Sequence, residues 1–314
     1  MQRSDIVRWA VMALLVVAGI GVFLRWYDGT GRVPVAQSVF PVFGLLAFML
    51  VIATAVMRER RLVVVALVIA LLPAILAFRA MRSDTVAAGP RDEVVMASNM
   101  EYGAADPATI VATVRERKVT SLVLVEVTPE GWRRLRVAGL GKLLPNMVGT
   151  PRAGADGTVI CSSRRLKALE SAHVPPRFDQ PVAEVQAPGG RYVLRAAHPY
   201  PPVPDLVHGW HDQLGELATW RAKQPRDVPL VIAGDFNASS AHPAFRHAAE
   251  TMTDAHRATG SGWVRTWPRD RRTPPFVQID HVLVRKLGVV DAGVVSVPDT
   301  DHAAIWARLR IGVG

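Results

Sequence analysis

The sequence predicts an α/β (or α+β) sandwich built around substantial sheets and preceded by three transmembrane helices. Two patterns favour this fold class: long uncharged apolar runs near the N-terminus, and alternating β-rich and helical segments after residue 91. The 314 residues include one cysteine, Cys161, which excludes an intramolecular disulfide and a cysteine-based zinc site. A hydrophobic content of 50% excludes a disordered or collagen-like chain.

The net charge of +10 is concentrated near the N-terminus. Residues 1–91 contain ten arginines and four acidic residues, whereas the remaining 223 residues contain 27 basic and 23 acidic residues. Because the N-terminal part also holds the apolar runs, we expect its positive excess to flank a membrane rather than to line a groove for a polyanion.

Three stretches near the N-terminus carry no charged residue. They are Trp9–Leu24, Val33–Met57 and Leu62–Phe78, with 16, 25 and 17 residues. At about 1.5 Å per helical residue, the middle stretch crosses a hydrocarbon core of about 30 Å, and the outer two cross it if flanking arginines extend to the headgroups. The sequence therefore predicts a membrane anchor over residues 1–82, with helices at about 6–25, 35–57 and 62–81.

Two alternatives stay open for these runs: core helices of a soluble protein, and a cleaved signal peptide for the first run. Short connectors at residues 25–32 and 58–61 separate the three runs, and the first run has no small-residue cleavage site. Both observations favour the anchor. The second connector contains Arg58, Arg60 and Arg61 directly at two membrane ends. With this connector in the cytoplasm, five arginines lie on each side of the membrane, so their number does not decide the orientation. The density of the cluster favours a cytoplasmic connector and hence an extracytoplasmic C-terminal domain.

A linker is expected at residues 83–91, followed by a domain over residues 92–314. Strands are expected at Val94–Asn99, Ser121–Val127, Thr158–Ser162, Tyr192–His198, Leu230–Gly234, Val277–Val284 and Ala303–Ile311. Helices are expected at Asp106–Arg117, Pro129–Val137 and Asp205–Lys223.

Polar residues follow several of these apolar strands. Enzymes with an α/β fold often place reactive groups there, on loops held by a rigid scaffold. Asn99 and Glu101 stand two residues apart after the first strand, although an ordinary strand boundary has the same pattern. Glu126 ends a nearly continuous apolar strand, where an unpaired carboxylate would be costly and a cation partner is attractive. A helix N-terminal acid is the alternative for Glu126.

Residues 234–237, Gly-Asp-Phe-Asn, form the most informative segment. A buried strand enters a glycine turn that presents Asp235 and Asn237, which are suited to hold a water or leaving oxygen and a phosphoryl oxygen. His198 also closes a strand, but a lone histidine there is more often structural. Asp280 and His302 lie in two separate acid–histidine dipeptides, so an aspartate can orient a histidine from another loop.

Together these residues resemble the endonuclease/exonuclease/phosphatase superfamily of divalent-metal phosphoesterases over roughly residues 94–309. The N-terminal spans and the segment Thr266-Trp267-Pro268 resemble its bacterial membrane-attached branch. The resemblance implies a four-layer sandwich in which two mixed β-sheets are flanked by helices.

The resemblance also implies a site for Mg²⁺ or Mn²⁺. Glu126 would be the principal ligand, and Asn99 and Asp301 would lie near the metal. Glu101 stands where some members carry an acidic residue around the metal. Carboxylate and amide oxygens suit these hard cations better than zinc.

The resemblance assigns catalytic roles to five further residues. Asp235 would orient or deprotonate the attacking water or assist the leaving group, and Asn237 would hydrogen-bond the phosphoryl group. His198 and His302 would flank the scissile phosphate, with Asp280 orienting His302.

The sequence thus predicts a membrane-anchored, Mg²⁺-dependent phosphoesterase that acts on a phosphodiester or phosphomonoester. Its substrate would be a lipid headgroup, a nucleic acid or another envelope phosphoester, and no feature indicates a protein partner. A nuclease is an alternative, with basic clusters at 133–136, 164–167 and 269–272 that are also typical of solvated faces. A non-catalytic binding module on the same fold is the other alternative.

Overall fold

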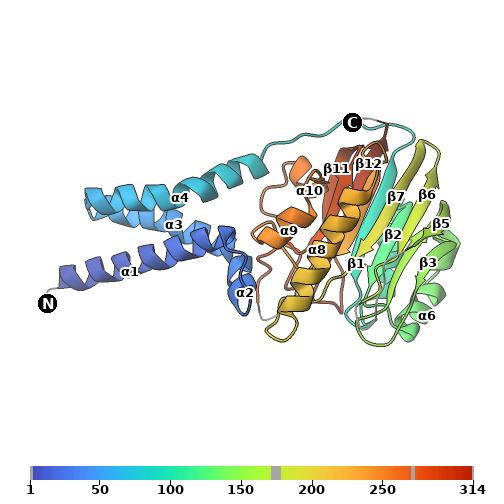
Figure 1. The fold of residues 1–314 in the computed structure, drawn as a ribbon, viewed down its shortest axis with the longest axis horizontal. Coiled ribbons are helices and arrows are strands. Elements are labelled where there is room, and N and C mark those ends of the chain that lie inside the picture. The colour runs from blue at the N-terminus through green and yellow to red at the C-terminus, as the bar shows by residue number, and fades with distance from the viewer. Residues whose placement is uncertain (1–2, 171–177, 270–272, 313–314) are drawn as a thin grey trace.

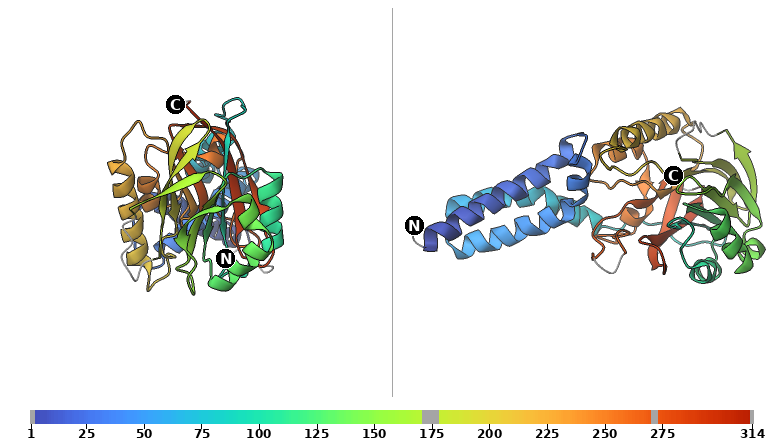
Figure 2. Two further views of the ribbon diagram at one scale, coloured as in Figure 1. Left: turned by 90° about the vertical axis from the view of Figure 1, so that its right-hand side faces the viewer. Right: turned by 90° about the horizontal axis from the view of Figure 1, so that it is seen from below.

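The computed structural model describes residues 3–170, 178–269 and 273–312 of the chain. A bundle of apolar helices projects from a larger sandwich of sheets and helices (Figure 1, Figure 2). Part of the third basic cluster, at 270–272, lies outside the described residues.

The sandwich contains two six-stranded mixed sheets. The first has the order β11-β12-β1-β2-β4-β3 and the second β5-β6-β7-β8-β10-β9. In chain order the strands are β1 (Glu93–Asn99), β2 (Ser121–Val125), β3 (Asn146–Thr150), β4 (Thr158–Ser162), β5 (Arg165–Leu169), β6 (Val182–Ala187), β7 (Gly190–Ala197), β8 (Leu230–Asp235), β9 (Thr253–Asp254), β10 (Asp280–Arg285), β11 (Leu287–Ser296) and β12 (Ala303–Ile311). The pairs β1/β2 and β7/β8 are parallel, and the other neighbours are antiparallel.

Side-chain alternation along the strands produces the layers. Val95 and Ala97 of β1 face the core between the two sheets, whereas Val94 and Met96 face the helices outside the first sheet. These helices are α5 (Pro107–Glu116), α6 (Pro129–Val137) and α7 (Leu140–Leu143), while α8 (Val207–Lys223) and α9 (Pro243–Ala248) cover the second sheet. The short α10 (Ala255–Ala258) packs against β10 and β11. The expected four-layer arrangement of two mixed sheets and flanking helices is therefore confirmed.

Local sequence explains where two of these helices begin. Asp106 accepts hydrogen bonds from the backbone N–H groups of Ala108 and Thr109 and precedes Pro107. Thr128 caps α6 in the same way through the N–H of Gly131. In both helices proline occupies the first position, where its missing N–H has no partner to lose.

The expected strands all appear, with shifts of a few residues at their ends. The largest shift is in β10, which begins at Asp280 rather than Val277, because Val277 pairs with Trp267 in an isolated bridge instead. The strands β3, β5, β6, β9 and β11 were not expected. Strands β3 and β5 are edge strands with mixed exposure, and β11 carries a register shift between Val289 and Asp291, so none has a regular alternation.

The N-terminal bundle comprises α1 (Arg3–Phe23), the 3₁₀ turn η1 (Leu24–Trp26), α2 (Val33–Ser38), α3 (Phe40–Val56) and α4 (Arg60–Ala80). Within the described ranges, two helical segments are long and apolar enough to cross a membrane, Ser4–Trp26 and Arg60–Ala80. The helix expected at 35–57 is instead divided into α2 and α3, so three spans are not confirmed. Pro41 explains the division, because it has no N–H for an intrahelical bond and its ring clashes with the preceding turn.

Large apolar side chains cover the outside of this bundle. Trp9, Met49 and Val68 are each more than 60% exposed, whereas smaller residues such as Ala18, Ala47 and Ala66 fill its interior. Apolar surface of this extent is typical of a contact with a membrane or with another protein.

Candidate active site

The nine candidate residues converge at one edge of the sandwich. Asn99, Glu126, His198 and Asp235 lie at or just after the carboxyl ends of the parallel strands β1, β2, β7 and β8. The antiparallel strands β10 and β12 begin at the same edge, which brings in Asp280 and His302. Glu101, Asn237 and Asp301 lie in the adjoining loops.

Asn99 joins the two halves of the site. Its side-chain N–H groups donate to Glu126 Oε1 and to Asp235 Oδ2, both at 3.0 Å. Its Oδ1 accepts the backbone N–H of Glu101 at 2.8 Å. In this orientation the amide of Asn99 holds two carboxylates from different sheets in fixed positions.

Three carboxylates crowd one side of the site. Burial raises the pKa of Glu101, and the negative charges of Asp301 and Glu126 raise it further. Burial would also raise the pKa of Glu126, but hydrogen bonds from His198, Asn99 and the backbone of Tyr102 outweigh it and hold that pKa below its usual value. Carboxylates that repel one another in this way are suited to bind a hard divalent cation.

A buried acid–base cluster occupies the other side. His302 Nδ1 lies 3.0 Å from Asp280 Oδ2, and its Nε2 lies 3.6 Å from Asp235 Oδ2. Burial alone would lower the pKa of His302, but the charges of Asp280 and Asp235 raise it to about 10. The imidazole is therefore protonated at neutral pH. Its Nδ1 donates to Asp280, whereas its Nε2 lies beyond hydrogen-bonding distance of Asp235.

Burial raises the pKa of Asp235 to about 6, with the charge of Asp280 adding to the shift and His302 opposing it. Ligand atoms of Asp235, Asp280 and His302 lie within 4.8 Å of one another. Because the protonated ring donates to Asp280 and forms an ion pair with Asp235, we interpret this cluster as an acid–base set and place the fit for a cation at the Glu126 side.

His198 and Asn237 border the site. His198 Nε2 lies 3.6 Å from Glu126 Oε1, and the ring of Phe178 stacks on the imidazole with centroids 4.7 Å apart. The backbone N–H of Asn237 donates to Asp235 Oδ1 at 2.7 Å, and its side-chain amide donates to Pro199 O at 3.1 Å.

Unusual backbone conformations coincide with the candidate residues. Glu101, Glu126 and Asn237 have φ values of 43°, 57° and 48°, in the left-handed region that costs non-glycine residues about 1–2 kcal/mol. Gly234 has φ 144°, and a Cβ there would lie 2.2 Å from Ala197 O. The packing of the surrounding sandwich maintains these strained backbone conformations. They occur where polar side chains from several loops point into one site.

The structure adds supporting residues without a role in the sequence interpretation. Trp267 Nε1 donates to Asp301 Oδ2 at 2.9 Å, and Thr300 Oγ1 donates to the carbonyl of Asn99 at 3.1 Å. In the sequence, Trp267 is marked only by its place in the segment Thr266-Trp267-Pro268. No sequence signal marks Thr300 as a residue that supports Asn99. His281, next to Asp280, leaves the site and lies 2.6 Å from Asp254 Oδ2.

A protein-family model described as the Endonuclease/Exonuclease/phosphatase family matches residues 96–302. No curated protein matches the chain.

Solved structures share the fold. TDP2 of D. rerio, complexed with single-strand DNA product, is 16% identical with a TM-score of 0.57, over 70% of this chain and 100% of that one. The endonuclease/exonuclease/phosphatase from Beutenbergia cavernae is 21% identical with a TM-score of 0.53, over 71% and 72% of the two chains. A family protein from Bacteroides thetaiotaomicron is 13% identical with a TM-score of 0.55, over 72% and 100%. At these identities the likeness concerns the fold alone.

Proposed function

Since the chain belongs to the endonuclease/exonuclease/phosphatase family, it is a hydrolase of phosphate esters, and we propose that it is a membrane-anchored enzyme that requires Mg²⁺ or Mn²⁺. One observation carries the proposal: the carboxylate group around Glu126 and the acid–base cluster around His302 form one connected network. A site for phosphate ester hydrolysis needs both parts at once.

We assign the cation to Glu126, with Glu101 and Asp301 completing the negative environment. A divalent cation there would neutralise charge on the non-bridging phosphoryl oxygens. Asn99 has both side-chain hydrogens committed to carboxylates. We therefore give it the task of orienting Glu126 and Asp235 beside the metal.

The protein's own groups would then align water and phosphate. Asp235 is the acceptor positioned for a proton of the attacking water, while the protonated His302 donates toward a phosphoryl oxygen. Asp280 fixes the His302 ring through Nδ1. Asn237 keeps one side-chain hydrogen for the phosphoryl group, and His198 borders the phosphate from the Glu126 side.

The binding-module alternative makes a different prediction. A module without catalysis has no need for an aligned proton acceptor, a buried imidazolium and a carboxylate group in one network. Titration of the full chain with Mg²⁺ or Mn²⁺ should show binding that Glu126→Gln weakens. Absence of metal binding by the wild-type chain would favour the binding module.

The proposed anchor has three membrane spans, with the catalytic domain outside the cytoplasm. The exposed apolar side chains of α1, α3 and α4 support it, and α3 would extend about 26 Å at 1.5 Å per residue. The cluster of Arg58, Arg60 and Arg61 supports the orientation. A reporter fused after Gly314 that is active only in the cytoplasm would contradict this topology.

The activity is tested with the full chain in detergent micelles and Mg²⁺, on a panel of DNA, RNA, phospholipids and phosphoinositides. We expect hydrolysis of at least one substrate, its loss in Asp235→Asn, and its retention in Asp227→Asn, a matched change in an exposed loop. Hydrolysis that survives in Asp235→Asn and His302→Ala would contradict the site. DNA cleavage with a steep salt dependence would identify a nuclease, whereas cleavage of phospholipid but not DNA would identify a lipid headgroup enzyme.

A further inference from the structure

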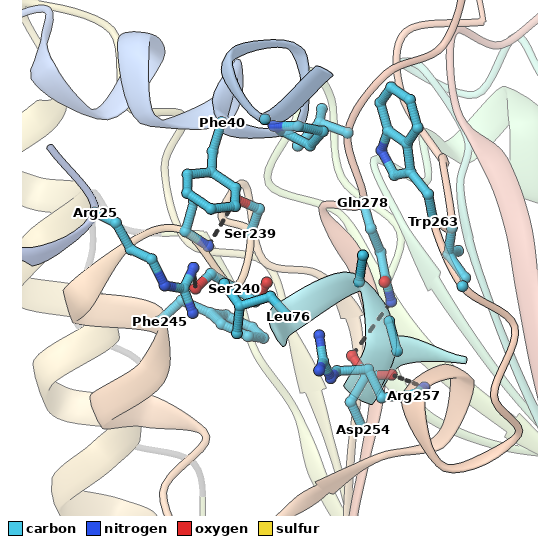
Figure 3. A pocket seen from close by; sticks show the side chains of 18 of the residues that line it. Arg25, Phe40, Leu76, Ser239, Ser240, Phe245, Asp254, Arg257, Trp263 and Gln278 are labelled. Atoms are coloured by element: carbon cyan, nitrogen blue, oxygen red, sulfur yellow. Dashed lines mark hydrogen bonds between the residues drawn. The ribbon is translucent and has the colours of Figure 1, made fainter. Parts of the chain in front are cut away.

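A cavity of about 740 Å³ lies between the N-terminal bundle and the catalytic domain (Figure 3). One wall comes from α3 and α4, and the other from α9, β9, β10 and the loops around them. None of the nine candidate active-site residues lines it. The cavity is therefore separate from the proposed catalytic site.

Defined polar contacts hold the two sides of the cavity together. The backbone N–H of Ser239 donates to His242 Nδ1 at 2.7 Å, so His242 Nε2 carries the proton that it donates to Pro34 O at 2.8 Å. Arg246 donates to Arg25 O at 2.8 Å. These contacts place the bundle at a fixed position on the domain.

Positive charge gathers on the lining. Arg25, Arg246 and Arg257 line the cavity, each is partly buried, and the charges of Arg246 and Arg257 are close enough to repel that of Arg25. Within the described part of the chain, none of the three forms an ion pair with a carboxylate. Asp28, whose side chain is 54% exposed, attracts Arg246 without lining the cavity.

Asp254 is the acidic residue of the lining, and its charge is already engaged. Its Oδ2 lies 2.6 Å from His281 Nδ1, and its Oδ1 accepts the backbone N–H groups of His256 and Arg257 at the start of α10. The three guanidinium groups therefore retain an excess of positive charge. Guanidinium groups bind phosphate oxygens strongly and with defined geometry.

The bundle side of the cavity is apolar and open to the outer face of the helices. Phe40, Leu45 and Phe48 come from α3, and Leu76 comes from α4. Leu45 and Phe48 are 51% and 41% exposed. An acyl chain can therefore leave the cavity along a helix surface that the proposed anchor places in lipid.

We propose that this cavity binds an anionic membrane phospholipid, with its phosphate at Arg25, Arg246 and Arg257 and its acyl chains against α3 and α4. The proposal rests on the membrane anchor of the proposed function, but not on catalysis. A site with cationic and apolar walls at the junction of bundle and domain matches an anionic amphiphile. The cavity volume falls in the range of about 300–1,000 Å³ that is typical of small-ligand sites and would hold the headgroup.

The test measures lipid retention by the full chain in non-ionic detergent micelles. The delipidated protein is exposed to equal amounts of phosphatidylcholine and phosphatidylglycerol with the same acyl chains, and retained lipid is quantified by mass spectrometry. We expect the wild type to retain phosphatidylglycerol preferentially. Arg257→Gln should reduce the preference about five-fold, the effect of one arginine near an anionic lipid, and Arg257→Lys should keep most of it.

Arg257 is the informative position, because Arg246 also donates to the backbone carbonyls of Ser240 and Ala241 and its loss would disturb the junction. The matched control is Arg115→Gln, an exposed arginine on α5, which should keep the wild-type preference. Equal retention of the two lipids, or a preference that Arg257→Gln leaves unchanged, would overturn the proposal.

The result is independent of the catalytic proposal. Retention is read without turnover, so Asp235→Asn should keep the preference while losing hydrolysis. A chain that stays soluble and monodisperse without detergent would contradict the anchor, and with it the source of the lipid. A lipid preference in a chain that lacks activity would leave the lipid site standing and contradict the catalytic site alone.

Discussion

The variant Asp280→Asn tests whether Asp280 positions His302 for hydrolysis or only stabilises the fold. Asp280 contacts His302 Nδ1 at 3.0 and 3.2 Å through its two oxygens, in a fully enclosed part of the site. The substitution keeps the shape but replaces a carboxylate by an amide, which removes a charge-assisted hydrogen bond worth about 1.5–3 kcal/mol. If that energy holds the imidazolium during hydrolysis, the rate should fall about 10- to 150-fold.

The assay is the initial rate of hydrolysis of the substrate that the panel identifies, at saturating Mg²⁺, for the full chain in micelles. Asp227→Asn supplies the control for charge removal alone. His302→Gln and the double variant Asp280→Asn/His302→Gln complete a cycle. Because Asp280 acts through His302, the double variant should be no slower than His302→Gln.

Two outcomes would contradict this role of Asp280. A rate for Asp280→Asn within two-fold of the wild type would show that the contact to His302 does not support hydrolysis. A double variant that loses the product of the two single effects would show that Asp280 acts independently of His302. Equal melting temperatures of wild type and variant would separate either outcome from unfolding.

Three further predictions concern backbone, metal and pH. Gly234→Ala should destabilise the chain by about 2 kcal/mol or more, because the new Cβ would clash with Ala197 O at a φ of 144°. The control Gly141→Ala, which has open space around it, should not destabilise the chain. Equal thermal unfolding of the two variants would contradict this. Glu126→Gln should raise the Mg²⁺ concentration for half-maximal activity at least ten-fold, on the order of the loss that even indirect metal contacts cause, and an unchanged requirement would remove Glu126 from the metal site. Burial lowers the pKa of His242 to about 4 from 6.5, so the unfolded chain binds more protons than the folded chain between these pH values. The free energy of unfolding should therefore fall by about 3 kcal/mol as pH decreases from 6.5 to 4. A melting temperature whose pH dependence is the same in His242→Phe would contradict this.

Much of the fold could be predicted from the sequence because its central strands are apolar on both faces. β1, β2 and β8 read as continuous apolar runs, since helices cover one face and the other sheet covers the opposite face. Edge strands such as β3 and β5 have no such signal. The division between α2 and α3 falls at Pro41. Because Pro73 lies inside the unbroken helix α4, the presence of a proline alone could not locate the division.

The candidate site was accessible from sequence for a related reason. Asn99, Glu126, His198 and Asp235 all follow strands, and parallel pairing brings the ends of such strands together. The protonation of His302 was not accessible, because it depends on two carboxylates that approach the ring from different strands. The cavity at the bundle–domain junction could not be predicted either, since Arg25 is more than 200 residues from Arg246 and Arg257 in the chain.

In the proposed mechanism, hydrolysis requires both the metal and the acid–base cluster, and one measurement tests both requirements. Phosphate ester hydrolysis by the full chain is followed while Mg²⁺ is removed and restored, in wild type and Asp235→Asn. We expect that wild-type activity disappears and returns with Mg²⁺ and that Asp235→Asn stays inactive at every Mg²⁺ concentration, although it still binds the metal. Hydrolysis by Asp235→Asn at the wild-type rate, or wild-type hydrolysis that persists without any divalent cation, would contradict it.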